Sequence, residues 1–240
     1  MCKIIWRTAQ INLKNLKAPY MITGVTTAIM IVNITVYAIL ALNGIDTSDQ
    51  EFISAGNALW LLPVLAGIYI PAKNFRRIVS LGGRRGNFFW GSLECYAVLS
   101  AAASFANVFI YCTIDTFIKR AGYFDVNFFA GVVNLVEVFG WIRHGVIAAF
   151  LQQFAFLFLF AVFTHTLTAT QDKWYGWVSD VMLVAIISVF TPIAPLRSAL
   201  AWFFTLILTH PNAFLQIFAC IILAIAIYSL NRPIFARKAI

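Results

Sequence analysis

Long apolar segments separated by short, positively charged ones constrain this chain more than any other feature of its sequence. A helix needs about 20 apolar residues to cross the roughly 30 Å hydrocarbon core of a bilayer. Six segments fit that requirement: Tyr20–Leu42, Ile53–Ala72, Phe88–Tyr111, Gly145–Leu167, Trp177 to about Pro195, and Asn212–Leu230. With 62% hydrophobic and 11% charged residues, the chain has too little polar surface for a soluble globule. We predict an all-α integral membrane protein whose residues 1–240 form a single transmembrane domain with six spans.

The positions of Lys and Arg predict how these spans are oriented. Cytoplasmic loops of membrane proteins carry an excess of Lys and Arg. With both termini in the cytoplasm, the cytoplasmic residues are Lys3, Arg7, Lys14, Lys17, Lys73, Arg76, Arg77, Arg84, Arg85, Lys173, Arg232, Arg237 and Lys238, and only Lys119, Arg120, Arg143 and Arg197 are external. The first external loop, Asn43–Ser54, contains three acidic residues and no basic one. A multi-pass protein with both termini in the cytoplasm is therefore predicted.

The N-terminal segment 1–19 is predicted to form an amphipathic helix that lies in the membrane interface. Its four cations, Lys3, Arg7, Lys14 and Lys17, fall within an arc of about 80° on a helical projection. Its apolar residues, Ile5, Trp6, Ala9, Leu13 and Leu16, occupy an adjoining arc of about 100°. Because proline lacks a backbone N–H, this helix is expected to end before Pro19.

Two segments outside the predicted spans are also rich in apolar residues. Within 196–211, only about 13 residues separate Pro195 from Thr209, which is too short for a span. We predict two short re-entrant helices there, on the external side between spans five and six, broken at Pro192, Pro195 and Pro211. The segment Thr116–His144 mixes Phe and Val with Asp and Asn, and it is predicted to lie on the outer membrane surface.

A basic loop, residues 73–87, separates the second and third spans and carries five of the 17 Lys and Arg residues. Because a cation at the bilayer centre costs about 2.5–3.5 kcal/mol, the loop is predicted to lie at the cytoplasmic surface. Its pattern predicts a short surface helix from Lys73 to Leu81. A break at Gly82 and Gly83 follows, since glycine permits the left-handed conformation at a helix end. The simpler interpretation is an orientation signal, in which case no single side chain of the loop matters.

The stretch NFRRIVSLGGRRGNFF in this loop resembles the first cytoplasmic loop of small ABC-2-type transporter permeases of Gram-positive bacteria. The matching positions are Asn74, Phe75, Ser80, Gly82, Arg85, Phe88 and Phe89. The chain is also similar to that family in length and in the order of its parts: an amphipathic N-terminal helix, six spans, and re-entrant external helices before the last span. The resemblance implies that loop 73–87 contains the coupling helix that docks into an ATP-binding subunit.

This resemblance implies the permease subunit of an ABC exporter in a bacterial cell membrane, paired with a second permease chain as a homodimer or heterodimer. The residues expected to bind the ATP-binding subunit are Asn74, Phe75, Arg76, Arg77, Ser80, Gly82, Arg84, Arg85 and Phe88, with Phe75 as the anchor. ATP and Mg²⁺ would be bound by the partner, since no GxxxxGK[ST] occurs here, and the chain itself is not expected to be an enzyme. Apolar spans favour a hydrophobic or amphipathic cargo, such as a peptide. The alternative is a channel-like or regulatory membrane protein without an ATPase partner.

Other functions find no support in the sequence. The His and Cys residues show no metal-binding or catalytic spacing, and no HExxH or GxSxG occurs, so neither a metal site nor a catalytic residue is predicted. The basic residues flank apolar stretches, which is typical of membrane orientation and not of nucleic-acid binding. Within the spans, Glu94 is expected to pair with Arg84 or Arg85, and Gln152 and Gln153 to form hydrogen bonds between helices.

Overall fold

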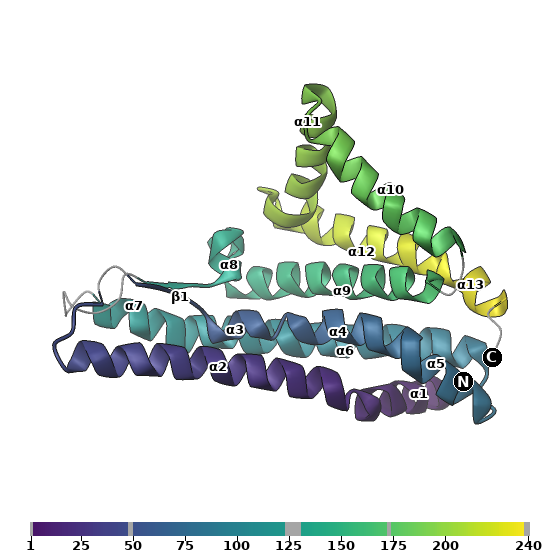
Figure 1. Cartoon of the computed structure of the whole chain (residues 1–240), viewed down its shortest axis with the longest axis horizontal. Coiled ribbons are helices and arrows are strands. Elements are labelled where there is room, and N and C mark those ends of the chain that lie inside the picture. The colour runs from purple at the N-terminus through teal and green to yellow at the C-terminus, as the bar shows by residue number, and fades with distance from the viewer. Residues whose placement is uncertain (1, 48–49, 123–130, 172–173, 238–240) are drawn as a thin grey trace.

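The computed structural model describes residues 2–47, 50–122, 131–171 and 174–237, and most of them are helical. Within these ranges, five helices are long and apolar enough to cross a membrane: α2 (Lys17–Leu42), Ala55–Ser80, Arg85–Arg120, Val146–Thr170 (α9) and Ala213–Phe235. They run side by side as an elongated bundle (Figure 1). The helical architecture expected from composition is therefore present, with about five helices that could span a membrane against the six predicted.

Helix α9 is the centre of the bundle. It packs against α4 (Leu61–Tyr69), α6 (Arg85–Ile110) and α12 (Ala213–Ser229). The crossing with α4 is close, since a Cβ on Gly67 would lie 2.1 Å from Thr164 Oγ1 and 2.5 Å from the Ala161 carbonyl oxygen. Small residues at such crossings let helix backbones approach each other in a membrane.

Buried polar side chains join the central helices. Gln152 Nε2 donates to Gln216 Oε1 over 2.5 Å and joins α9 to α12, as expected for Gln152. The Tyr96 hydroxyl lies 2.5 Å from His165 Nδ1 and joins α6 to α9. Because no water is present in hydrocarbon, such pairs satisfy polar groups that would otherwise be costly to bury.

The second span is one continuous helical stretch that begins later and ends later than predicted. It comprises α3 (Ala55–Ala58), α4, a π-helical turn η1 (Ile70–Asn74) and α5 (Phe75–Ser80). The short helix predicted from Lys73 to Leu81 is present as α5, but it continues the span instead of following a loop. Pro71 cannot donate a helical hydrogen bond, and the wider π turn accommodates that loss without ending the helix.

The predicted surface segment Thr116–His144 is also organised differently. The third span runs on from α6 through a π-helical turn η2 (Tyr111–Asp115) into α7 (Thr116–Gly122). Residues 131–144 then form β2 (Gly131–Val133), α8 (Leu135–Val138) and a short 3-10 helix η3 (Trp141–His144). Strand β2 pairs in parallel with β1 (Glu51–Ile53), so the described part of the chain is not purely helical.

Helix α1 (Cys2–Asn15) packs onto the bundle instead of only lying in the interface. Its inner face buries Thr8, Ala9 and Asn12 against α6, where a Cβ on Gly91 would lie 2.8 Å from Thr8 Cβ. The break that separates α1 from α2 falls at Leu16. Pro19 therefore lies in the first turn of α2, where its missing N–H is tolerated.

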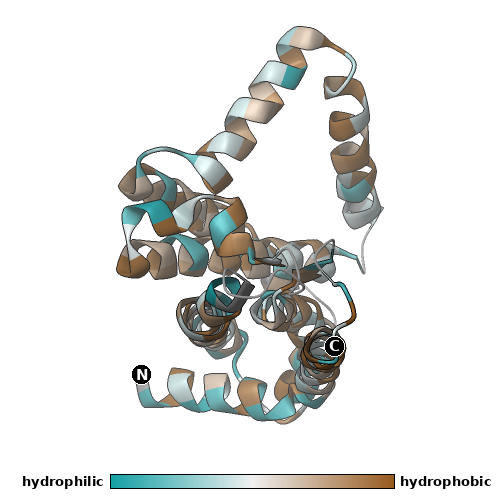
Figure 2. Cartoon of the chain, turned by 90° about the vertical axis from the view of Figure 1, so that its left-hand side faces the viewer, coloured by the Kyte–Doolittle hydropathy of each residue, from teal (hydrophilic) through white to brown (hydrophobic). Residues whose placement is uncertain are grey.

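The fifth apolar segment forms a bent pair of helices that stands away from the bundle (Figures 1 and 2). Helix α10 (Trp174–Phe190) is followed by α11 (Ala194–Phe204) and a π-helical turn η4 (Thr205–Thr209), and the two arms differ in direction by 118°. The predicted re-entrant region is thus one helix and not two pieces. Pro192 lies in the bend, whereas Pro195 lies in the first turn of α11.

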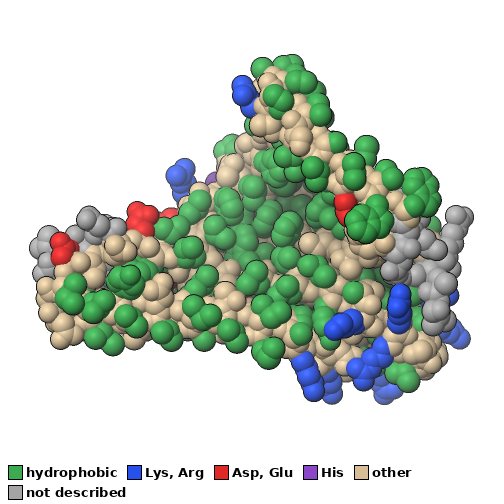
Figure 3. All heavy atoms as spheres, viewed as in Figure 1, with side chains coloured by type: hydrophobic (Ala, Val, Ile, Leu, Met, Phe, Trp, Pro, Cys, Tyr) green, Lys and Arg blue, Asp and Glu red, His purple; other side chains and the backbone are tan. Residues whose placement is uncertain are grey.

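Charge is unevenly distributed along the molecule (Figure 3). Exposed Lys and Arg side chains gather at the end where both termini lie, which includes α1, α5 and α13 (Asn231–Arg237). Acidic side chains gather at the opposite end, near the β1–β2 pair. Two of the predicted cytoplasmic cations, Lys173 and Lys238, lie outside the described residues.

Candidate functional site

The inner face of α5 is buried in the core of this chain. The Phe75 ring lies 5.2 Å from that of Phe88 on α6 and 4.9 Å from that of Phe235 on α13, measured between centroids. We call Phe75, Phe88 and Phe235 the aromatic cluster. Phe75 and Phe88 are fully buried, so neither is available as the exposed anchor for a partner that the sequence suggested.

Asn74 also faces inward. Its Nδ2 donates to Asn12 Oδ1 over 3.1 Å, and Asn12 Nδ2 in turn donates to Ser92 Oγ over 3.3 Å. All three side chains are buried, and they join the end of the second span to α1 and α6. Of the nine predicted partner-binding residues, Asn74, Phe75 and Phe88 therefore position α5.

The outer face of α5 presents cations around an exposed leucine. The residues that define this surface, here called the basic ridge, are Arg76, Arg77, Ser80, Leu81 and Arg84. Leu81 is 80% exposed at the tip. Arg77 donates to Asn15 Oδ1 over 3.3 Å, and the Ser80 hydroxyl donates to the Arg77 carbonyl oxygen over 3.0 Å. The ridge is thus held against α1 at its base.

A glycine turn ends α5 and redirects the chain into α6. Gly82 has φ of 82°, the left-handed conformation expected for it. The Gly83 N–H donates to the Ile78 carbonyl oxygen over 2.9 Å, and a Cβ on Gly83 would lie 2.7 Å from that same oxygen. Both glycines are therefore required by the geometry of the turn.

Glu94 does not form the predicted ion pair with Arg84 or Arg85. Arg85 instead donates to the Phe235 carbonyl oxygen over 3.1 Å, which ties α6 to α13. Within the described part of the chain, Glu94 makes no ion pair, and its Oε2 is buried without a hydrogen-bond partner. Nine residues separate Arg85 from Glu94 on one helix, or about 13 Å, which is too far for direct contact.

Leu81 is the one residue of the basic ridge that sequence reasoning did not single out. The signal was available, because Leu81 follows Arg77 by four residues and therefore lies on the same helical face. Leu81 directly precedes the glycine turn, and its side chain is exposed among the cations of the ridge.

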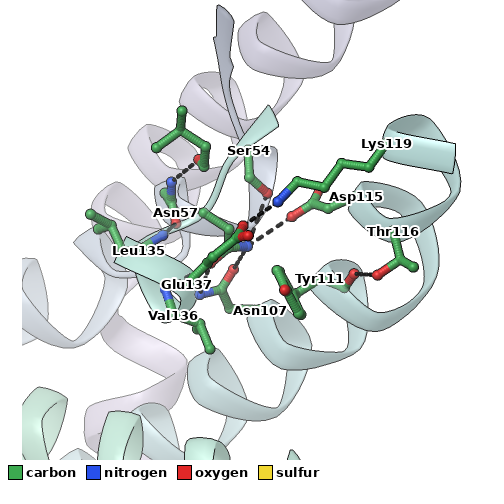
Figure 4. Close-up of polar contacts among 12 residues, drawn as sticks. Ser54, Asn57, Asn107, Tyr111, Asp115, Thr116, Lys119, Leu135, Val136 and Glu137 are labelled. Atoms are coloured by element: carbon green, nitrogen blue, oxygen red, sulfur yellow. Dashed lines mark hydrogen bonds and ion pairs between the residues drawn. The ribbon is translucent and has the colours of Figure 1, made fainter. Parts of the chain in front are cut away.

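A second polar site lies at the opposite end of the bundle (Figure 4). Asn134 Nδ2 lies 3.2 Å from Ser54 Oγ and 2.9 Å from Asp115 Oδ2, beside the Asn107 amide. Asn57 receives a hydrogen bond from the Leu135 N–H over 3.0 Å, and Lys119 forms an ion pair with Glu137. Because these groups satisfy one another, we interpret this site as a structural junction that holds the third span to both strands.

The junction is built from two similar pieces of chain. Ser54 follows β1 and accepts a hydrogen bond from the Gly56 N–H, whereas Asn134 follows β2 and accepts one from the Val136 N–H. Each piece then leads to a tryptophan, and Trp60 and Trp141 stack with centroids 5.8 Å apart. Ser and Asn before a short helix are recognisable capping signals in the sequence. The hydrogen bond between Asn134 and Ser54, which are 80 residues apart, cannot be recognised in the sequence.

No metal-binding group of three or more His, Cys, Asp or Glu side chains exists among the residues that the structure describes. Cys95, Cys112 and Cys220 are free thiols. Comparisons of this chain with models of protein families, with curated proteins and with solved structures found no match.

Proposed function

We propose that this chain is the permease subunit of an ABC exporter and that the basic ridge docks an ATP-binding subunit. The chain would cross a bacterial cell membrane six times, with the bent pair α10–α11 as span five and its re-entrant helix. Both termini and the basic ridge would face the cytoplasm. The gathering of exposed cations at the end with the termini supports this orientation.

The two-sided character of α5 carries this proposal. Its inner face is fixed through Phe75 in the aromatic cluster, and its outer face presents Leu81 among cations. An orientation signal needs charge alone. A docking element needs an exposed surface together with rigid attachment to the spans, and α5 has both.

The attachment also suggests how movement of a partner would reach the spans. Packed aromatic side chains transmit displacement because protein interiors are dense and resist compression. A subunit that displaced the ridge would move Phe75, and Phe75 contacts α6 through Phe88 and α13 through Phe235. ATP binding and hydrolysis by the partner would thus tilt the second and third spans together.

The ridge has the composition of a small docking surface for an acidic groove. A central apolar side chain that becomes buried on binding contributes most of the affinity, and charges at the rim mainly govern encounter and salt dependence. We assign Leu81 the first role and Arg76 with Arg77 the second. Gly82 and Ser80 would shape the turn, with Arg84 at its edge.

The proposed cargo is hydrophobic or amphipathic, such as a peptide. Support comes from a pocket of about 320 Å³ between α6 and α9, whose lining residues are Phe105, Val108, Phe109, Cys112, Val146, Ile147 and Phe150. None of these side chains is charged. The proposed second permease chain would cover part of the exposed apolar surface of α10 and α11, with lipid covering the remainder.

The test compares two variants, each with one aliphatic side chain replaced by Asp. The tagged chain is co-expressed with the genes on either side of its own, so that an ATP-binding subunit encoded there can assemble with it. Leu81→Asp should remove magnesium-dependent ATPase activity from the purified complex and stop efflux of a labelled amphipathic peptide. Ile45→Asp is the control, because Ile45 is 50% exposed at the opposite end and the chemical change is the same. It should leave both readouts intact.

If the complex purified with the Leu81→Asp variant had normal ATPase activity, docking at the basic ridge would be contradicted. Absence of any ATPase from the wild-type preparation, together with ion or peptide conductance of the chain alone in liposomes, would favour the channel-like alternative.

A further inference from the structure

A basic pocket opens beside the aromatic cluster, where the third candidate span begins and the last one ends. It has a volume of about 460 Å³, and its lining residues are Arg85, Gly86, Phe89, Trp90, Ser229, Arg232 and Phe235. This volume falls within the range of roughly 300–1,000 Å³ that is usual for small-molecule sites. The pocket is distinct from the basic ridge, since no ridge residue lines it.

The walls of this pocket are fixed by contacts between distant parts of the chain. The Tyr228 hydroxyl donates to the Phe89 carbonyl oxygen over 2.6 Å, and their rings lie 4.4 Å apart. Arg85 donates to the Phe235 carbonyl oxygen over 3.1 Å. These contacts hold the start of α6 against α12 and α13, so the pocket is formed before any ligand arrives.

The pocket is suited to an anion. Two of its described lining residues are Arg, from different helices, and none is Asp or Glu. It also includes Gly86 in the first turn of the 26-residue helix α6, a helix start that has no side-chain cap. The positive end of that helix adds to the field of the two guanidinium groups.

The mouth of the pocket has the character of a membrane interface. Trp90 lines it and is 50% exposed, and Phe89 packs at its side with ring centroids 5.3 Å apart. Tryptophan is enriched at the level of lipid headgroups. Exposed apolar side chains continue from there along the spans, including Val98 on α6 and Ile225 on α12.

We propose that this pocket binds the headgroup of an anionic phospholipid. The phosphate would lie between Arg232 and Arg85 at the start of α6, and the acyl chains would pass Trp90 and follow the apolar surfaces of α6 and α12. Basic pockets between membrane helices recognise lipid headgroups in this way. A soluble phosphate would contact the two arginines but would not contact Trp90 and Phe89 at the mouth of the pocket. The proposal requires only that the chain lies in a membrane and is independent of its transport function.

The purified full-length chain is placed in nanodiscs that contain equal amounts of phosphatidylglycerol and phosphatidylcholine. It is then extracted into a mild detergent, and native mass spectrometry measures the lipid that it retains. Wild type should retain phosphatidylglycerol selectively, and Arg232→Gln should retain about fivefold less, the effect of removing one cation beside an anionic headgroup. Arg84→Gln is the matched control, because Arg84 is exposed nearby but does not line the pocket, and it should retain lipid as wild type does.

A second readout separates the sources of the phosphate group. Phosphatidylglycerol should raise the melting temperature of wild type more than phosphatidylcholine does, and millimolar inorganic phosphate should not reproduce the shift. Equal loss of lipid in Arg84→Gln and Arg232→Gln would overturn the proposal, since it would mean general attraction to a basic surface. A shift reproduced by inorganic phosphate would overturn the assignment to lipid.

Discussion

The rings of Phe75 and Phe235 lie 4.9 Å apart, although 160 residues separate them in the chain. This contact joins the end of the second span to the C-terminal helix α13. Phe88 completes the cluster at 5.4 Å from Phe235. The position at which the sequence suggested an exposed anchor is therefore a point where three helices meet.

Replacing Phe75 should destabilise the chain itself. Truncating a buried Phe to Ala costs about 3–5 kcal/mol, because transfer energy is lost and a cavity remains. We expect Phe75→Ala to lower the melting temperature in detergent and the amount of protein in the membrane, with or without a partner. Phe75→Leu should cost less. A normal melting temperature for Phe75→Ala would mean that the ring is not buried.

The crossing of α4 and α9 should not tolerate a methyl group at Gly67. In Gly67→Ala the new Cβ would meet Thr164 Oγ1 at 2.1 Å and the Ala161 carbonyl oxygen at 2.5 Å. Thr164→Ala should not rescue this variant, since the clash with the backbone remains. Gly24→Ala is the control, because nothing lies within 4 Å of that position. Melting curves of wild type, Gly67→Ala, Gly67→Ala with Thr164→Ala, and Gly24→Ala would test this. Equal stability of Gly67→Ala and Gly24→Ala would refute a close crossing.

The polar junction should depend on Asn134. In Asn134→Ala, Asp115 and Ser54 lose a buried donor, and an unsatisfied buried group costs about 1–3 kcal/mol. Asn43→Ala removes only an exposed contact with Ile39 in the same helix and should be close to neutral. Limited proteolysis at the end with β1 and β2 should increase for the first variant alone. If both variants resisted proteolysis equally, the junction would not be a stabilising network.

Glu94 should be dispensable for stability. Its Oε2 is buried without a partner in the described structure, so Glu94→Gln removes a charge that the chain does not compensate. We expect an unchanged or higher melting temperature. A marked loss of stability would show that the carboxylate is paired in the assembled protein, with a second chain supplying the partner.

Cysteine labelling tests the orientation. In a background without Cys2, Cys95, Cys112 and Cys220, an impermeant maleimide added to intact cells should label Ile45→Cys and leave Leu81→Cys unlabelled. Leu81→Cys should react after permeabilisation, since its side chain is well exposed. Labelling of Leu81→Cys in intact cells would place the basic ridge outside and exclude a cytoplasmic partner.

Features that depend on neighbouring residues were predictable from the sequence, and features that depend on contacts between distant residues were not. Apolar length indicated the spans, and Gly82 indicated the end of α5, because each is a property of neighbouring residues. The continuation of the second span beyond Ala72 into α5 was not predictable, since the Lys and Arg residues that follow are typical of a loop at the membrane surface. The burial of Phe75 depends on Phe235, and no short pattern in the sequence links them. The same holds for Ser54 and Asn134.

The parallel pairing of β1 with β2 has a consequence for biogenesis. Partners in this junction are 80 residues apart, as for Ser54 and Asn134, and the third span lies between them. During synthesis β1 is made long before its partner exists, and its pairing must wait until the third candidate span and the chain that follows it have been added. A chain truncated after α7 would retain the first three candidate spans but leave Ser54 and Asp115 without Asn134. The unpaired Ser54 hydroxyl and Asp115 carboxylate would therefore distinguish an incomplete chain from a complete one.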